Sequence, residues 1–317
     1  MTRPQLGVNP EASGRSESDQ HLTGSQWRQV PVHLPEGKAT LHVNDNTDTT
    51  VSQLLQRLRN GRYAKPFVLE DGEFRQLHFS LRFTQSRMSL RLPDALSLAY
   101  TRKMMSFLLF QPQPKHVVIV GLGGGSLTKF CYRHLPDTRI TTIEIDQAVI
   151  DLATLFHVPS PDARMRIVHA DAVEYLTTTC QSADVILIDG CDKHGVAPAL
   201  CDEGFFDILR KRLRPGGVLA MNLVGTVGHS NALIRVLASA FDHQVLVLDV
   251  SIGDNRIAFA FRDRKWPPDW SEIKQRAVGL AEQYGLDFVA FAERLETSCH
   301  NGMVHATPTK GRRTKPR

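Results

Sequence analysis

Residues 117–126, which read Val-Val-Ile-Val-Gly-Leu-Gly-Gly-Gly-Ser, constrain the fold of this chain more than any other stretch. The β-branched apolar run predicts a buried strand, and the glycines allow the backbone to turn sharply. Helical spacing of apolar residues follows over residues 126–134. Strand, glycine turn and helix are typical of a nucleotide-binding βαβ unit, in which Gly121, Gly123 and Gly125 would let a ligand approach the backbone. A turn formed only for packing is the alternative.

The next predicted strand, residues 140–145, favours the nucleotide interpretation. It carries Glu144, and Asp146 follows it, about 20 residues after the glycines, where a carboxylate can accept hydrogen bonds from both ribose hydroxyls. We therefore predict an adenosine-type ligand, with the glycine turn and Glu144 among its contacts. For Asp146 the alternative role is to cap the helix that follows, a role that suits Asp.

Acids also follow the third and fourth strands, predicted at residues 166–170 and 184–189. The third is followed by Asp171, and the fourth ends in Asp189 with Asp192 close behind. Because ligands of open α/β sheets bind beyond the carboxyl ends of the strands, these acids are expected to border one site. For Asp171 the alternative is again a helix cap, and for Asp192 it is a solvated loop position.

From Pro114 onward, predicted strands alternate with predicted helices. The strands are expected at residues 117–121, 140–145, 166–170, 184–189, 217–223, 244–250 and 255–261. Near-continuous apolar strands imply a mostly parallel sheet covered on both faces. The last two strands must form an antiparallel hairpin, because residues 252–254 are too few for a crossover helix. The predicted fold class is α/β: a mostly parallel sheet with one antiparallel strand, which resembles the Rossmann-like sheet of S-adenosylmethionine-dependent methyltransferases, with a small N-terminal β region.

The remaining segments complete the expected domain organisation. A short strand at 38–43, a helix at 51–58 and strand-like patterns between 67 and 90 form a small N-terminal α+β region over residues 26–92. A helix at about 95–110 begins the catalytic domain, residues 93–298, and a C-terminal helix is expected over 271–284. Residues 1–25 and the basic tail 299–317 are expected to be disordered.

Composition limits the class of protein. Of the 317 residues, 42% are hydrophobic, which is ordinary for a globular protein, and no run of ~18 apolar residues predicts a membrane span. Five cysteines without C-x-x-C spacing argue against a disulfide framework or a zinc site, so we expect a metal-free protein in the reducing cytoplasm. The net charge of +5, much of it in the tail, does not favour a nucleic-acid partner.

The acids also distinguish between nucleotide chemistries. A dehydrogenase would account for the glycine turn and Glu144, but not for Asp171 or for Asp189 and Asp192. A sulfonium nucleoside accounts for all of them: Glu144 would hold the ribose, and Asp171 and the Ala172 amide would bind the adenine. Alkyl transfer from such a ligand needs alignment, exclusion of water and a nucleophile with a lone pair. For an amine nucleophile, Asp189 is the candidate proton acceptor.

Over residues 67–222 the chain resembles the spermidine synthase (polyamine aminopropyltransferase) family. The matching features are the early strands with Gln85, the helix carrying Tyr100, the glycine turn, Glu144-Ile-Asp146, Asp171-Ala172, and Asp189-Gly-Cys-Asp192 followed by Gly195 and Leu200. The resemblance implies metal-independent aminopropyl transfer from decarboxylated S-adenosylmethionine to a small amine in polyamine biosynthesis, by a homodimer. It also implies donor-binding roles for Gln85, Tyr100 and Asp146, and an amine-binding role for Asp192.

Three departures from the family pattern bear on the reaction. The family's glycine loop carries an aspartate where this chain has Gly124, which makes intact S-adenosylmethionine more acceptable as the co-substrate. The family's Tyr-His-Glu is Tyr100-Thr101-Arg102 here, and its Asp-Pro is replaced by Lys193-His194. The expected function is aminopropyl transfer to an amine. The alternatives are an S-adenosylmethionine-dependent methyltransferase, or a catalytically degenerate family member that binds the nucleoside.

Overall fold

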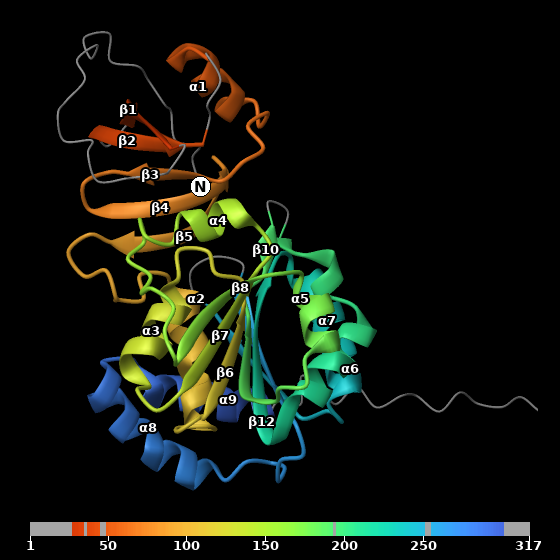
Figure 1. Ribbon diagram of the computed structural model, residues 1–317. Coiled ribbons are helices and arrows are strands. Elements are labelled where there is room, and N and C mark those ends of the chain that lie inside the picture. Colours follow the sequence, from red (N-terminus) through yellow and green to blue (C-terminus); the bar gives the residue numbers. More distant parts are fainter. Residues whose placement is uncertain (1–26, 35–36, 45–48, 193–194, 251–254, 301–317) are drawn as a thin grey trace, which may run out of the picture.

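The described part of the chain contains a small five-stranded sheet near the N-terminus, a large seven-stranded sheet flanked by helices, and a two-stranded hairpin (Figure 1). The structure, a computed structural model, describes residues 27–34, 37–44, 49–192, 195–250 and 255–300. The disorder expected for residues 1–25 and for most of the basic tail therefore concerns residues outside the described part.

The small sheet is antiparallel and has five strands in sequence order. They are β1 (Arg28–Leu34), β2 (Gly37–Val43), β3 (Phe67–Glu70), β4 (Phe74–Ser80) and β5 (Phe83–Ser89). Helix α1 (Val51–Arg59) begins at a capping box formed by Thr50 and Gln53 and buries three leucines. Strand β1 was not expected from the sequence. It contains Pro31, whose missing N–H is tolerated because β1 is the edge strand of its sheet.

The large sheet has seven strands in the order β13-β14-β12-β9-β6-β7-β8. These are β6 (His116–Val120), β7 (Arg139–Glu144), β8 (Met165–His169), β9 (Ala183–Ile188), β12 (Leu213–Val224), β13 (Val245–Asp249) and β14 (Asn255–Phe261). Strand β14 runs antiparallel to β12 and β13, while the β12–β9–β6–β7–β8 pairs are parallel. The predicted fold class, including the antiparallel hairpin, is confirmed.

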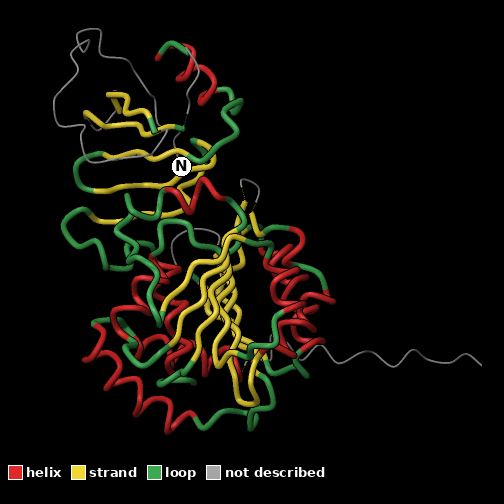
Figure 2. The backbone as a smooth tube through the Cα atoms, in the orientation of Figure 1, coloured by secondary structure: helices red, strands yellow, loops and turns green. Residues whose placement is uncertain are grey.

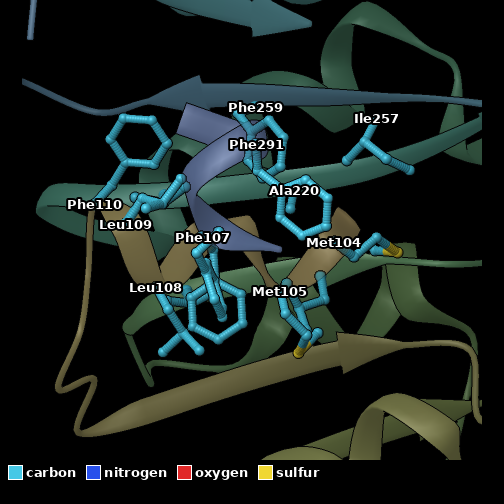
Figure 3. Packing of buried hydrophobic residues seen from close by; sticks show 14 of the residues in the cluster. Met104, Met105, Phe107, Leu108, Leu109, Phe110, Ala220, Ile257, Phe259 and Phe291 are labelled. Carbon is cyan, nitrogen blue, oxygen red and sulfur yellow. The ribbon is translucent and has the colours of Figure 1, made fainter. Parts of the chain in front are cut away.

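Helices cover both faces of the large sheet (Figure 2). They are α2 (Ala99–Met104), the 3₁₀ helix η1 (Met105–Leu109), α3 (Ser126–His134), α4 (Gln147–Asp151), α5 (Ala172–Thr178), η2 (Pro198–Leu200), α6 (Glu203–Arg212), α7 (Val227–Ala240), α8 (Trp270–Tyr284) and α9 (Phe288–His300). Val117 and Ile119 of β6 pack with α2, η1, α3, α8 and α9, whereas Val118 and Val120 pack with α5, α6 and α7. Figure 3 shows the first core, with the side chains of η1 at its centre.

The helix boundaries differ from expectation in two places. The helix expected over 95–110 begins only at Ala99, and after Met104 it continues as a 3₁₀ helix. Its residues Met105 to Leu109 are all buried, so packing against the sheet decides the local geometry. C-terminal helices were expected up to residue 298, but the residue range of α9 was not predicted. Within the described ranges, no helix is long and apolar enough to cross a membrane.

The small sheet lies over the glycine turn of the large domain (Figure 1). An apolar cluster joins the two, formed by Val68, Leu77 and Met88 of the small sheet with Leu122, Val149, Leu152 and Phe156. Arg75 of β4 strengthens the contact, because its guanidinium donates to the carbonyl oxygen of Leu155 and pairs with Glu70. The carboxyl edge of the large sheet therefore faces the small sheet, and the candidate site lies between them.

Candidate active site

The glycine turn requires glycine at its predicted positions for two physical reasons. Gly121, Gly123 and Gly125 have φ values of +93°, +51° and +67°, a region that side chains strain. A Cβ on Gly121 would also lie 2.4 Å from the carbonyl oxygen of Asp189, and one on Gly125 would lie 2.3 Å from Val158 Cγ2. The turn thus brings the backbone of β6 against the end of β9, where the candidate base stands.

Glu144, at the end of β7, fastens the turn. It is 8% exposed; its Oε2 accepts from the Leu122 amide at 2.8 Å and its Oε1 from the Asp146 amide at 2.9 Å. Each carboxylate oxygen has a second acceptor position, so the group can still take two ribose hydroxyls. The next residue, Ile145, is 64% exposed although apolar. Its side chain is an exposed apolar surface next in the chain to Glu144, a feature that the sequence reasoning missed.

Asp146 and Asp171 both cap helices, as their alternative interpretation held. Asp146 Oδ1 accepts from the Ala148 amide at the start of α4. Asp171 caps α5 through Oδ1 alone, which accepts from Val173 at 2.7 Å and from Glu174 at 3.1 Å. Among the described residues, Asp171 Oδ2 carries no hydrogen bond, so capping and binding of an adenine amino group are compatible. Ala172 is the first residue of α5, where backbone amides lack intrahelical partners.

Asp189 follows β9 and is held from two sides. Tyr100 of α2 donates its hydroxyl hydrogen to Oδ2 at 3.0 Å, and Asn222 of β12 donates from Nδ2 to Oδ1 at 2.8 Å. Burial raises the pKa of Asp189 to about 6, against the lowering effect of these two hydrogen bonds. Tyr100 was predicted to bind the group-transfer donor, S-adenosylmethionine or its decarboxylated form. The structure brings its hydroxyl to the candidate base.

Two asparagines at this edge were missed by the sequence reasoning. Besides Asn222, Asn255 at the start of β14 donates from Nδ2 to Asn222 Oδ1 at 2.9 Å. Asn222 could have been found, because it is a polar residue near the carboxyl end of an apolar strand, as the acids are. Asn255 had no such signal: it begins an antiparallel strand, and only the sheet order brings that end to the same edge.

The position of the missing loop aspartate is closed by neighbouring side chains. A Cβ on Gly124 would lie 2.6 Å from Ser86 Oγ and 2.8 Å from Phe156 Cδ1. Ser86 belongs to β5, so the small sheet fills the space that the family's aspartate would need. Gln85, the predicted donor contact, precedes Ser86 at an irregularity of β5, where Ser86 pairs with Leu77 and Thr84 with His78.

The structure gives less detail for Asp192 and for the positions where the chain departs from the family pattern. The backbone of Asp192 lies in a short hairpin of β10 (Cys191–Asp192) and β11 (Gly195–Val196), and Lys193 lies outside the described residues. Arg102 donates from Nη1 to the carbonyl oxygens of Leu96 at 2.6 Å and Ser97 at 3.2 Å. Its guanidinium is therefore held by backbone carbonyl groups of the segment just before α2. In the described ranges, no group of three His, Cys, Asp or Glu side chains is arranged to hold a metal ion.

Comparison with known proteins agrees with this geometry. Residues 97–242 match the family model of the spermine/spermidine synthase domain. The polyamine aminopropyltransferase of Neisseria meningitidis serogroup A is 35% identical over 254 residues, covering 79% of this chain and 97% of that protein. The chain belongs to the polyamine aminopropyltransferase family.

Solved structures show the same fold at lower identity. A probable spermidine synthase from Corynebacterium glutamicum superposes with a TM-score of 0.57 at 18% identity, covering 68% of this chain and 84% of that one. Human methyltransferase-like protein 13, solved in complex with SAH, gives a TM-score of 0.51 at 23% identity over 69% of this chain and 94% of that one. The expected resemblance to the spermidine synthase (polyamine aminopropyltransferase) family is confirmed.

Proposed function

We propose that this protein transfers an aminopropyl group from decarboxylated S-adenosylmethionine to a small amine, with Asp189 as the proton acceptor. The observation that carries the proposal is the partly buried Asp189 carboxylate, held by Tyr100 and Asn222 directly beside the glycine turn. Its pKa of about 6 makes it a stronger base than an ordinary aspartate, yet leaves it ionised at neutral pH. Family membership supports the reaction type.

The proposed chemistry is a single displacement. The amine lone pair attacks the propyl carbon bonded to the sulfonium, the N–C bond forms, and the C–S bond breaks. The sulfur keeps the electron pair and leaves as the neutral thioether methylthioadenosine, so no acid is needed for the leaving group. The proton of the amine passes to Asp189. The protein contributes alignment, a water-poor site and this proton acceptor.

The nucleoside end of the donor is assigned to the second and third strands. Glu144 would bind the ribose hydroxyls, and Ile145 would pack on the base. Asp171 Oδ2 and the Ala172 amide would bind the adenine edge. This assignment is supported by the free acceptor positions of the two carboxylates and by the exposed apolar side chain of Ile145. Gln85 and the turn glycines stay predicted donor contacts, and Asp192 a predicted amine contact.

One observation favours a second function, and it concerns which form of S-adenosylmethionine is the donor. At Gly124 no side chain fits, so the loop lacks the negative charge that would repel a donor carboxylate. Intact S-adenosylmethionine can then enter the site, and methyl transfer is the second candidate. Its product would be S-adenosylhomocysteine instead of methylthioadenosine, which makes the two reactions distinguishable by chromatography.

The test is incubation of the purified protein with either donor and a panel of di- and polyamines. We expect methylthioadenosine and an aminopropylated amine from decarboxylated S-adenosylmethionine. Asp189→Asn should lower the rate by about 10²–10⁴, the contribution typical of a general base. Its thermal stabilisation by methylthioadenosine should persist, which would show an intact nucleoside site. Turnover of the intact donor alone would replace the proposal with methyl transfer. Stabilisation by ligand with no turnover of either donor would identify a degenerate member.

A further inference from the structure

Asp189 stands at the end of a chain of hydrogen bonds that crosses three neighbouring strands. Asn222 of β12 donates to Asp189 Oδ1 at 2.8 Å, and Asn255 of β14 donates to Asn222 Oδ1 at 2.9 Å. Strands β9, β12 and β14 are adjacent in the large sheet. Asn222 is 3% exposed, so water cannot readily replace either partner of its amide group. Breaking one of these hydrogen bonds would leave a buried polar atom unpaired, which is costly.

The chemistry of the three groups fixes the direction of donation. An ionised carboxylate only accepts hydrogen bonds, so Asn222 must turn its amino group toward Asp189 and its carbonyl oxygen toward Asn255. Asn255 supplies a donor to that oxygen. If Asn222 rotated by half a turn about its terminal bond, its amino group would face the amino group of Asn255, and its carbonyl oxygen would face the carboxylate. Asn255 therefore opposes the wrong orientation of Asn222.

The two oxygens of Asp189 consequently differ in what they can do. Oδ1 faces an amide that donates and cannot take up a proton. Oδ2 faces the Tyr100 hydroxyl, which can both donate and accept. We propose that Asn222 and Asn255 are positioning residues that confine proton acceptance by Asp189 to Oδ2. The inference rests on the proposed function, in which Asp189 is the base.

Among the described residues, Lys103 of α2 and Arg256 of β14 hydrogen-bond to groups outside this arrangement. Lys103 of α2 donates from Nζ to the carbonyl oxygen of Asp249 at 2.5 Å. Arg256 of β14 donates from Nε to the Asp249 carboxylate at 2.7 Å and from Nη1 to Asn231 Oδ1 at 2.5 Å. Among the described residues of α2, Tyr100 is the titratable group that hydrogen-bonds to Asp189. The hydrogen bond from Asn222 lowers the pKa of Asp189, so weakening that bond should raise it.

The experiment is the pH profile of kcat for Asn255→Ser, Asn255→Ala and Asn255→Asp. Serine keeps a donor, alanine removes it, and aspartate, which has nearly the same shape, attracts the Asn222 amino group away from Asp189. We expect the acid limb to stay close to the wild-type position in Asn255→Ser. It should move to higher pH in Asn255→Ala and furthest in Asn255→Asp. At pH 9, where Asp189 is ionised in every variant, kcat of Asn255→Ala should return to within about threefold of wild type.

Asn231→Ala is the matched control. Asn231 of α7 accepts a hydrogen bond from Arg256, the residue that follows Asn255 in β14, and does not hydrogen-bond to Asp189. Its acid limb should coincide with that of wild type. Retained thermal stabilisation by methylthioadenosine shows that each variant is folded, and Asn255→Asp keeps the test decisive if Asn255→Ala does not fold. An unmoved limb in both Asn255→Ala and Asn255→Asp, in an active wild-type enzyme, would overturn the inference. A wild-type enzyme without methylthioadenosine release would instead refute the proposed function.

Discussion

At the scale of single residues, the four glycines of the turn are required for different reasons. Gly121, Gly123 and Gly125 adopt positive φ, which their side-chain-free backbone permits. Gly124 has no such constraint, and is limited instead by Ser86 and Phe156. The glycine pattern in the sequence predicted the turn, but it could not separate a conformational requirement from a steric one, because the second depends on residues more than 30 positions away on each side.

Gly124→Ala should therefore destabilise the protein. The new methyl group would lie 2.6 Å from Ser86 Oγ and 2.8 Å from Phe156 Cδ1, and overpacking of this kind costs about 1–3 kcal/mol. The measurement is the free energy of unfolding by urea denaturation. Gly279→Ala is the control: this glycine lies in α8, and a Cβ added to it would have no neighbour within 4 Å, so alanine should be neutral or stabilise by up to ~1 kcal/mol. Equal effects at the two positions would contradict the steric explanation of the missing aspartate.

At the scale of elements, the acids at the strand ends have structural roles beside the roles proposed for them in the candidate site. Asp171 caps α5 through Oδ1, and among the described residues its Oδ2 carries no hydrogen bond. Sequence reasoning offered capping and binding as alternatives, because a sequence does not show which oxygen of a carboxylate is used. In the same way, the apolar pattern over 95–110 predicted one helix, whereas burial of Met105 to Leu109 imposes a 3₁₀ segment after Tyr100.

Asp171→Ala should lower both stability and nucleoside affinity. Loss of the cap costs about 0.5–2 kcal/mol, and loss of Oδ2 removes the proposed acceptor for the adenine amino group. Asp269→Ala is matched to it, since Asp269 Oδ1 caps α8 through two amides in the same way, at 3.1 and 3.2 Å. Asp269→Ala should lower the melting temperature comparably while leaving the calorimetric Kd for methylthioadenosine unchanged. An unchanged Kd in Asp171→Ala would remove Asp171 from the site.

At the scale of the whole molecule, the small sheet makes stability sensitive to acid. His78 is buried in β4, stacked on Phe67, and burial lowers its pKa to about 4. Burial also lowers the pKa of His42 in β2. A histidine with a lowered folded-state pKa is protonated first in the unfolded chain. The stability it contributes is therefore complete above pH 6.5 and is lost as the pH falls from 6.5 toward 4.

Between pH 7 and pH 4.5, the loss attributable to His78 should be roughly 2–3 kcal/mol, since one pKa unit corresponds to about 1.4 kcal/mol. Urea denaturation at the two pH values measures it. His78→Gln cannot be protonated in this range, so it should be less stable than wild type at pH 7 but lose less stability on acidification. His229→Gln, at an exposed position, should follow the wild-type pH dependence. A loss of the same size in His78→Gln would contradict this assignment.

The sequence by itself determined the α/β class, the glycine turn, the antiparallel end of the sheet and the acids at the ends of consecutive strands. These follow from local periodicity and from the rule that parallel strands bring their carboxyl ends to one edge. Only the tertiary structure decided the partners of Asp189, because Tyr100 and Asn222 approach it from a helix and a strand distant in the chain, and Asn255 holds Asn222 from a further strand. The tertiary structure also showed why position 124 is glycine, because close packing between the small sheet and the turn leaves no volume there for a side chain.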